Sequence, residues 1–220
     1  MKHIENEIKI LKNHHIEMWN LVQGQLIKSY EALRKSDKTL AREIIAKERV
    51  VNAQELLVDH YCESFIALFS PVALDFRFVI SIFKITNNLE RIADFAENIA
   101  LFVLYDQTKP IDKVLYEKLR LEEMMRLTEG MFLSARTALI NEDSHLCGEI
   151  LKTDNQVDNL YGNAIESLAE YVAENPEEAL EVLHLNSVIR RIERIGDRTG
   201  NIAEDIVFFV EAEELRHQKF

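Results

Sequence analysis

The stretch NLERIADFAENIA at residues 88–100 returns, with substitutions, as RIERIGDRTGNIA at residues 191–203. The two copies stand 103 residues apart in a chain of 220 residues, so they indicate an internal duplication. Ser70-Pro71 and Asn175-Pro176 repeat at a similar offset of 105 residues. A period of this length is too long for a solenoid of short repeats, so we expect two copies of one larger unit.

Turn-forming residues are scarce, because the chain has only six glycines and three prolines. Such a composition disfavours many-stranded sheets, and neither glycine-rich phosphate-binding motif occurs. Apolar residues recur with helical spacing between the few turn signals, and each proline precedes such a stretch, as expected for the first turn of a helix. The predicted helices cover residues 4–34, 37–69, 72–105, 111–139, 143–174 and 177–212.

These six long helices predict an all-α fold of two tandem antiparallel three-helix bundles related by duplication. The first repeat covers residues 1–106 and the second covers residues 107–220. Gly196 lies inside the repeated phrase, where a turn is excluded, so we expect it to allow a close approach between helices.

Charge and hydropathy exclude several partners. The net charge of −12 disfavours nucleic acid, whose backbone is itself anionic. The longest apolar runs fall far short of the roughly 20 residues that cross a membrane, so no membrane insertion is expected. Cys62 and Cys147 are isolated, and residues 1–10 carry Glu5 and Glu7 without an apolar stretch, so we do not expect them to form a signal peptide. These features predict a cytoplasmic protein with two free thiols.

Carboxylates gather on the helix face opposite the apolar residues. Glu90 and Asp94 stand four residues apart in the first copy of the repeated phrase, and Glu193 and Asp197 do so in the second. Like charges at this spacing repel by a few tenths of a kcal/mol, so their presence in both copies indicates that something compensates the repulsion.

The preceding helices carry matching pairs, Asp154 with Asp158 and Glu48 with Asn52. Each repeat therefore brings oxygen-bearing side chains of two neighbouring helices to one surface. Two interpretations stay open at this point. One is a solvated face on which the carboxylates form salt bridges with arginines, and the other is a hard cation bound by oxygen ligands. The arginines concerned are Arg91, Arg190 and Arg194.

Over nearly its whole length the chain resembles the PhoU family of bacterial phosphate-transport accessory proteins. The resemblance rests on NLERIAD at residues 88–94 and RIERIGD at residues 191–197, each followed by Asn-Ile-Ala, and on the proline-led segment PVALDFR at residues 71–77. It implies a cytoplasmic protein that is not an enzyme, that forms a homodimer, and that negatively regulates phosphate-starvation signalling and phosphate uptake.

The implied partners are the ATPase subunit of the phosphate ABC transporter and a sensor histidine kinase. The resemblance also implies iron or zinc clusters at surface carboxylate motifs, one in each repeat. By position, the second-repeat site has Asp154, Asp158, Glu193 and Asp197 as ligands, and the first-repeat site has Glu48, Asn52, Glu90 and Asp94.

Two departures from the family pattern bear on these sites in opposite directions, and the first of them favours the second site over the first as a metal site. Asn52 stands where the family usually has Asp, and an amide oxygen is a weaker, neutral ligand. Arg190, however, replaces Asn87 in the second repeat and is expected to neutralise part of that stripe.

Two other functions are compatible with parts of this sequence. A metal-free helical adaptor keeps the fold and assigns the carboxylates to salt bridges. A di-iron carboxylate enzyme needs two inward-facing Glu-x-x-His motifs. The chain has three such pairs, which are Glu142–His145, Glu181–His184 and Glu214–His217. Only His184 is expected inside a helix, and it has no counterpart in the first repeat.

Some remaining residues were expected to be structural. His14 and His15 are predicted to be surface or partly buried residues, not ligands. Trp19 is open to either a core or a partner-facing role. The aromatic residues are expected mostly to pack in the core; they are Phe65, Phe69, Phe76, Phe83, Phe102, Phe208 and Phe209.

Overall fold

The computed structural model describes residues 2–107 and 109–212, and all regular structure in these residues is helical. The prediction of an all-α fold is confirmed. The helices are α1 (Lys2–Lys35), α2 (Lys38–Phe69), α3 (Ala73–Leu101), α4 (Lys113–Lys118), α5 (Leu121–Asn141), α6 (Ser144–Glu174) and α7 (Ala179–Glu211). A π-helical turn, Phe102–Asp106, follows α3, and a 3₁₀ turn, Pro176–Glu178, precedes α7.

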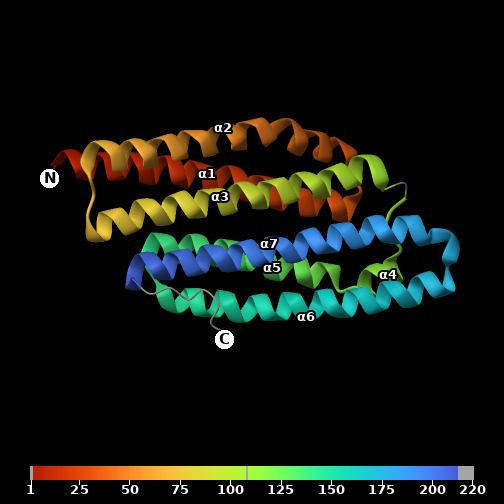
Figure 1. Ribbon diagram of the computed structural model, residues 1–220. Helices are drawn as coiled ribbons and strands as arrows, with labels where there is room; N and C mark the ends of the chain where they lie inside the picture. Colours follow the sequence, from red (N-terminus) through yellow and green to blue (C-terminus); the bar gives the residue numbers. More distant parts are fainter. Residues whose placement is uncertain (1, 108, 213–220) are drawn as a thin grey trace.

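The long helices form two antiparallel groups of three, α1–α3 and α5–α7 (Figure 1). The third helices of the two groups, α3 and α7, lie side by side at the centre and run in opposite directions. Helix α1 also contacts α5, so the two groups share a broad interface. The predicted division after residue 106 stays a prediction, because one apolar core passes through both groups.

Two aspartates begin long helices, as their cap chemistry predicts. The carboxylate of Asp37 accepts hydrogen bonds from the backbone N–H groups of Thr39 (2.9 Å) and Leu40 (3.0 Å) at the start of α2. Asp143 accepts from the N–H of Leu146 (3.1 Å) at the start of α6. Each bond satisfies one of the donors that a helix N-terminus leaves without a partner.

The prediction of one helix over residues 111–139 is wrong. The chain instead forms the short helix α4, breaks at Arg120, which has a left-handed φ of 51°, and resumes as α5. Leu119 and Leu121 are both fully buried. Side chains two residues apart point in nearly opposite directions on a continuous helix, and the left-handed turn at Arg120 lets both leucines join the same apolar core.

The other predicted long helices are confirmed with small changes at their ends. The third helix stops at Leu101 and continues as the π-helical turn, and the last helix begins after the 3₁₀ turn that opens at Pro176. Proline lacks a backbone N–H, so it is suited to the start of such a turn.

Trp19 belongs to the core, at the contact between the two groups of helices. Its ring centroid lies 4.7 Å from that of Phe132 on α5. Its indole Nε1–H donates to Nε2 of His15 (3.0 Å), so the proton of a neutral His15 is on Nδ1, which lies 3.1 Å from the Thr86 hydroxyl. Burial lowers the pKa of His15 to about 3, which keeps the ring neutral.

The structure corrects the remaining expectations for histidine and phenylalanine. His15 is fully enclosed and is neither a surface nor a partly buried residue, because Trp19 and Thr86 satisfy both of its ring nitrogens. Phe76 and Phe83 are about two-fifths exposed (43% and 41%) and do not belong to the core. Helical spacing alone did not separate their face of α3 from the buried one.

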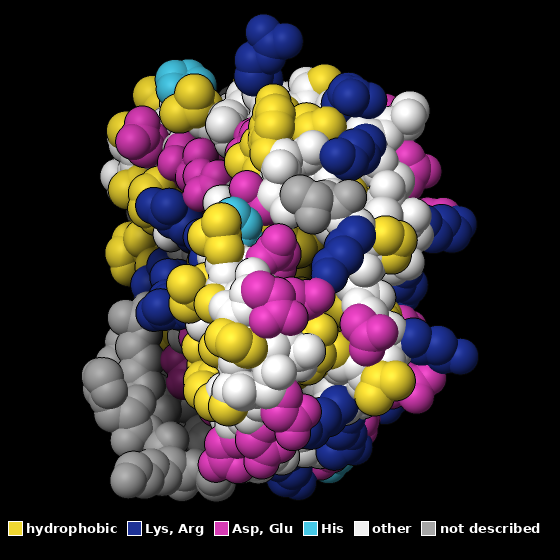
Figure 2. All heavy atoms as spheres, turned by 90° about the vertical axis from the view of Figure 1, so that its right-hand side faces the viewer, with side chains coloured by type: hydrophobic (Ala, Val, Ile, Leu, Met, Phe, Trp, Pro, Cys, Tyr) yellow, Lys and Arg dark blue, Asp and Glu magenta, His cyan; other side chains and the backbone are white. Residues whose placement is uncertain are grey.

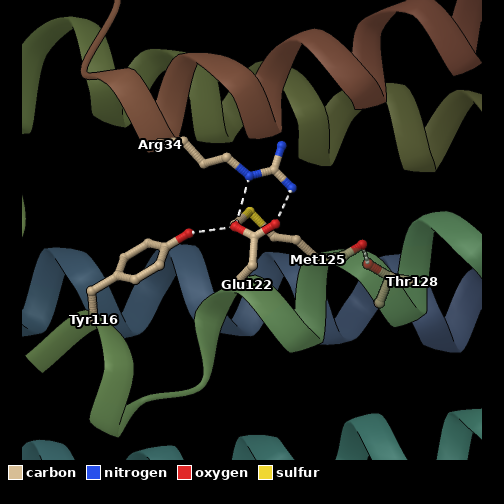
Figure 3. A network of polar contacts seen from close by, with 5 residues as sticks. All are labelled: Arg34, Tyr116, Glu122, Met125 and Thr128. Atoms are coloured by element: carbon tan, nitrogen blue, oxygen red, sulfur yellow. Dashed lines mark hydrogen bonds and ion pairs between the residues drawn. The ribbon is translucent and has the colours of Figure 1, made fainter. Parts of the chain in front are cut away.

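A polar network also joins the two groups of helices (Figure 3). Arg34 of α1 donates from Nε and Nη2 to the two oxygens of Glu122 on α5, at 2.8 and 2.9 Å. The hydroxyl of Tyr116 on α4 donates to the same carboxylate at 2.9 Å. The Arg34 guanidinium holds the pKa of Glu122 below its usual range. Such a two-point bond fixes orientation as well as distance.

None of the described helices is long and apolar enough to cross a membrane. At the end of the molecule where α3 stops and α7 begins, acidic and apolar side chains are interspersed with basic ones (Figure 2). Among the exposed apolar side chains of the segments that meet there are Tyr105, Val114, Leu180 and Leu183.

Candidate metal centres

The second repeat brings three of its four predicted carboxylates together. Asp154 and Asp158 stand one turn apart on α6 and face Asp197 on α7. One oxygen of each lies within 4.8 Å of one oxygen of each of the others. The fourth predicted residue, Glu193, lies one turn before Asp197, and both Asp197 and Asp158 raise its pKa. We call Asp154, Asp158 and Asp197 the second cluster.

Two glycines let Asp154 approach α7 closely. A Cβ atom on Gly196 would lie 2.9 Å from Oδ1 of Asp154, and one on Gly200 would lie 3.1 Å from Oδ2. Any side chain at these positions would therefore displace the carboxylate or the helix. The expectation that Gly196 allows close helix approach is confirmed, and the group that approaches it is a carboxylate.

The second cluster is electrostatically unfavourable when all of its carboxylates are ionised. Burial raises the pKa of Asp154 to about 7, and Asp197, Asp158 and Glu193 add to the shift. Burial and then Asp197 raise the pKa of Glu193 to about 7 as well. No described residue donates a hydrogen bond to the buried Oδ1 of Asp154. A bound cation would remove both penalties.

The first repeat forms a similar group with a different membership. Oxygens of Glu48 on α2 and of Asp94 and Glu97 on α3 all lie within 4.8 Å of one another. We call these residues the first cluster. Glu48 is buried, and neither of its carboxylate oxygens has a hydrogen-bond partner among the described residues. Burial raises its pKa to about 7, and Glu97 and Asp94 contribute to the shift.

Glu97 was not among the predicted ligands, although it lies on the same helical stripe as Asp94. Its counterpart at the repeat offset is Gly200, so the pairing of carboxylates between the two copies does not include it. The predicted ligand Asn52 is exposed on α2, and no hydrogen bond joins it to a described residue. Glu90 lies beside the first cluster, where burial and then Asp94 raise its pKa to about 7.

Arginine neutralises the two clusters unequally. Arg91 forms ion pairs with Glu90 (3.5 Å) and with Asp94 (3.3 Å), as the salt-bridge interpretation predicts for the first repeat. In the described part of the second repeat, neither Arg190 nor Arg194 forms an ion pair with a carboxylate, although both lower the pKa of Glu193 from a distance. The second cluster is thus the less compensated of the two.

The residues of the second cluster fit a metal ion. Their donors are all carboxylate oxygens, the ligands that hard cations prefer and that zinc and non-haem iron also accept. Carboxylates on exposed helices often bind no metal ion, because water solvates them. Asp154 differs from them, since it is partly buried and its Oδ1 has no hydrogen-bond partner among the described residues. The identity of the metal stays a prediction.

The residues of a di-iron enzyme do not come together. Glu142 caps the end of α5 and His145 lies in the first turn of α6, so the expectation that only His184 stands inside a helix is wrong. Glu181 and His184 lie near the start of α7, at the opposite end of the molecule (Figure 1). His184 instead lies 3.7 Å from the carboxylate of Asp106. The pair Glu214–His217 lies outside the described residues.

The raised pKa of Asp154 predicts a pH-dependent effect of Asp154→Asn on the metal-free protein. Between about pH 4 and 7 the folded chain holds this proton and the unfolded chain loses it, so stability falls as pH rises through that window. At pH 8 the free energy of unfolding of the variant should exceed that of the wild type by about 1–3 kcal/mol, because that is the usual cost of burying a polar group without a hydrogen-bond partner.

The measurement is urea unfolding of both chelator-treated proteins at pH 8 and pH 5. The advantage of Asp154→Asn should shrink at pH 5, where the wild-type carboxyl is protonated. His15 titrates in both proteins and cancels from the comparison. A variant that is less stable than the wild type at pH 8 would contradict this account.

Substitution of the two types of helical glycine should have opposite results. Gly162→Ala on α6 places a Cβ where no atom lies within 4 Å, so it should stabilise the protein by roughly 0.5–1 kcal/mol. Gly196→Ala forces the Asp154 carboxylate away from α7, so the helix-stabilising effect of alanine should be lost at this position. The same displacement should weaken zinc binding at least tenfold. Thermal unfolding and a zinc titration of both variants test this. Equal zinc affinity would show that the position of Asp154 is unimportant.

Comparison with known proteins gives one family. The model of the PhoU domain matches residues 16–103 and again residues 121–206. The phosphate-specific transport system accessory protein PhoU of Escherichia coli is 31% identical over 220 residues, covering 98% of this chain and 90% of that protein. The PhoU homologue of Archaeoglobus fulgidus is 34% identical over 217 residues and covers 98% of both chains.

Solved structures agree with this result. The crystal structure of PhoU from Pseudomonas aeruginosa superposes with a TM-score of 0.89 at 27% identity, covering 95% of this chain and 99% of that one. The phosphate transport system regulatory protein PhoU from Streptococcus pneumoniae gives a TM-score of 0.87 at 26% identity, covering 96% and 99%. These names describe accessory and regulatory proteins, in agreement with the prediction that the chain is not an enzyme. Two tandem matches of the family model, together with relatives similar over nearly the full chain, establish that this protein belongs to the PhoU family.

Proposed function

We propose that this chain is a cytoplasmic regulator of phosphate homeostasis that restrains phosphate-starvation signalling and phosphate uptake. Membership of the PhoU family carries this proposal, because relatives similar over almost the entire chain are named as accessory proteins of the phosphate-specific transport system. The proposed partners are the ATPase subunit of the phosphate ABC transporter and a sensor histidine kinase. The chain would act as a homodimer that binds both.

Exposed apolar side chains support a role in protein binding. Tyr105, Val114, Leu180 and Leu183 are each more than three-fifths exposed, and the segments that carry them meet at one end of the molecule. Acidic, apolar and basic side chains are interspersed on this end (Figure 2). Exposed apolar groups rimmed by polar residues are typical of protein-interaction surfaces.

We further propose that the second cluster binds iron or zinc and that the first cluster binds it more weakly. The observation that carries this proposal is the group of Asp154, Asp158 and Asp197, whose oxygens converge without an arginine partner. In the first cluster, Arg91 already neutralises part of the charge. A metal in the second cluster would hold α6 to α7 and so stabilise the surface that partners contact.

The regulatory proposal predicts the phenotype of a gene deletion. In phosphate-replete medium, loss of the protein should raise alkaline phosphatase expression and phosphate uptake, because the restraint on the sensor kinase is removed. Reintroduction of the wild-type gene should restore both to their basal levels. Unchanged expression and uptake after deletion would contradict the proposed function.

The metal proposal predicts the metal content of purified protein and its variants. Elemental analysis of protein prepared without chelators should find iron or zinc, and the double variant Asp154→Asn, Asp197→Asn should lose most of it. Glu166→Gln is the matched control, because Glu166 is an exposed carboxylate of α6 outside the cluster.

Wild-type protein with less than about a tenth of a metal ion per chain would favour the metal-free adaptor instead. Expression of the double variant in the deletion strain separates the two proposals. If it restores regulation without binding metal, the chain regulates as an adaptor and the clusters serve another purpose.

A further inference from the structure

The surface between α3 and α7 holds a groove of about 590 Å³ that no step of the proposed function uses. It lies where the two repeats meet and shares Arg198, Asn201 and Glu204 with the hollow beside the second cluster. Lys84, Asn87 and Asn88 line the α3 wall, and Arg198 and Asn201 line the α7 wall. Both walls therefore carry one cation and at least one amide.

Arg198 is available to a ligand. Its side chain is only partly exposed, yet it forms no hydrogen bond or ion pair with any described residue. It also lines the hollow beside Asp154 and Asp197, so it stands between the groove and the second cluster. Its charge acts on Asp197 from a distance and lowers the pKa of that carboxyl, but none of its five N–H donors is used by a described residue, so they remain available to an anion.

Lys84 supplies the second cation, although it is partly engaged. Its Nζ lies 3.5 Å from Oδ1 of the buried Asp205 and 4.9 Å from the ring centroid of Phe208. An ammonium group has three donors, so the ion pair with Asp205 leaves donors for a ligand. The pair also fixes the position of Lys84 at the rim of the groove.

The two acidic residues of the groove do not block an anion. Asp205 is 3% exposed and is paired with Lys84. Glu204 also lines the hollow of the second cluster, where it contributes to the raised pKa of Asp154. Asp205 is thus compensated by Lys84, and Arg198 forms no ion pair with a described carboxylate, although its charge lowers the pKa of Asp197.

From this arrangement we propose that the α3–α7 groove binds a phosphate group, either as inorganic phosphate or as the phosphate of a small ester such as a nucleotide. Arg198 and the donors that the ion pair leaves on Lys84 would bind phosphate oxygens, and the amides of Asn87 and Asn201 would donate to the remaining ones. A phosphate group has at least three acceptor oxygens for the donors of the two walls, whereas a carboxylate has two.

The exposed ring of Phe83 at the rim of the groove offers a face on which the base of a nucleotide could stack. The groove is also within the usual size range of small-molecule sites. The binding experiment therefore includes both sources of the phosphate group.

The test is calorimetric titration of chelator-treated, dialysed full-length protein with inorganic phosphate, AMP or acetate. Phosphate or AMP should bind with a Kd below about 1 mM. Acetate should bind at least tenfold more weakly. Arg198→Gln should weaken binding at least tenfold without unfolding the chain, because Arg198 has no described partner to lose. Arg42→Gln, an exposed arginine of α2, should bind as the wild type does.

Tighter binding of AMP than of phosphate, lost in Arg198→Gln, would support the proposal with a nucleotide as the source. Tighter binding of phosphate, lost in the same variant, would support it with free phosphate as the source. The proposal would be overturned if neither phosphate nor AMP bound at ten times the expected Kd limit of about 1 mM. It would also be overturned if Arg198→Gln bound them as tightly as the wild type does. The proposal does not depend on a metal or on the regulatory partners, so its failure leaves the proposed function standing.

Discussion

Repulsion between carboxylates that the apolar core holds together is the constraint on which the functional surface depends. Isoleucines on the opposite face of α7 are fully buried, so the helix cannot turn Asp197 away from Asp154 without exposing them. Two full charges 4.8 Å apart repel by about 3.5 kcal/mol at an effective dielectric constant of about 20. The fold thus places charges where only protonation or a cation relieves them.

Duplication explains why carboxylates are held together in both repeats, and later divergence of the two copies explains why the first and second clusters differ. Asp154 fits between Gly196 and Gly200 and reaches α7 with a short side chain. In the first repeat, Ala93 and Glu97 occupy the matching positions of α3, and the longer Glu48 is the buried acid. Arg91 then compensates part of the charge there. One ancestral arrangement has become a more compensated cluster and a less compensated one.

Much of this organisation could be predicted from the sequence. The repeated phrase and the three prolines predicted an all-α duplicated fold, and the spacing of Asp154, Asp158 and Asp197 predicted that they would share a surface. The break at Arg120 was missed because helical periodicity does not report that Leu119 and Leu121 are both buried. Glu97 was missed because its repeat counterpart is a glycine. The groove between α3 and α7 was beyond prediction, since it depends on how the two repeats dock.

The interface between the repeats connects these features. Trp19 and Phe132 pack across it, Arg34 and Glu122 bridge it, and Lys84 and Asp205 pair across its centre. Both clusters and the groove between them therefore sit on one continuous framework. A ligand in any one of the three would contact helices that also support the others.

Anomalous X-ray diffraction from crystals grown with zinc or ferrous iron tests the central claim most directly. The account predicts a peak between α6 and α7, at about 2.0–2.2 Å from oxygens of Asp154 and Asp197, with a weaker peak or none at the first cluster. Metal-containing crystals without a peak at the second cluster would contradict the claim that its carboxylates form a cation site.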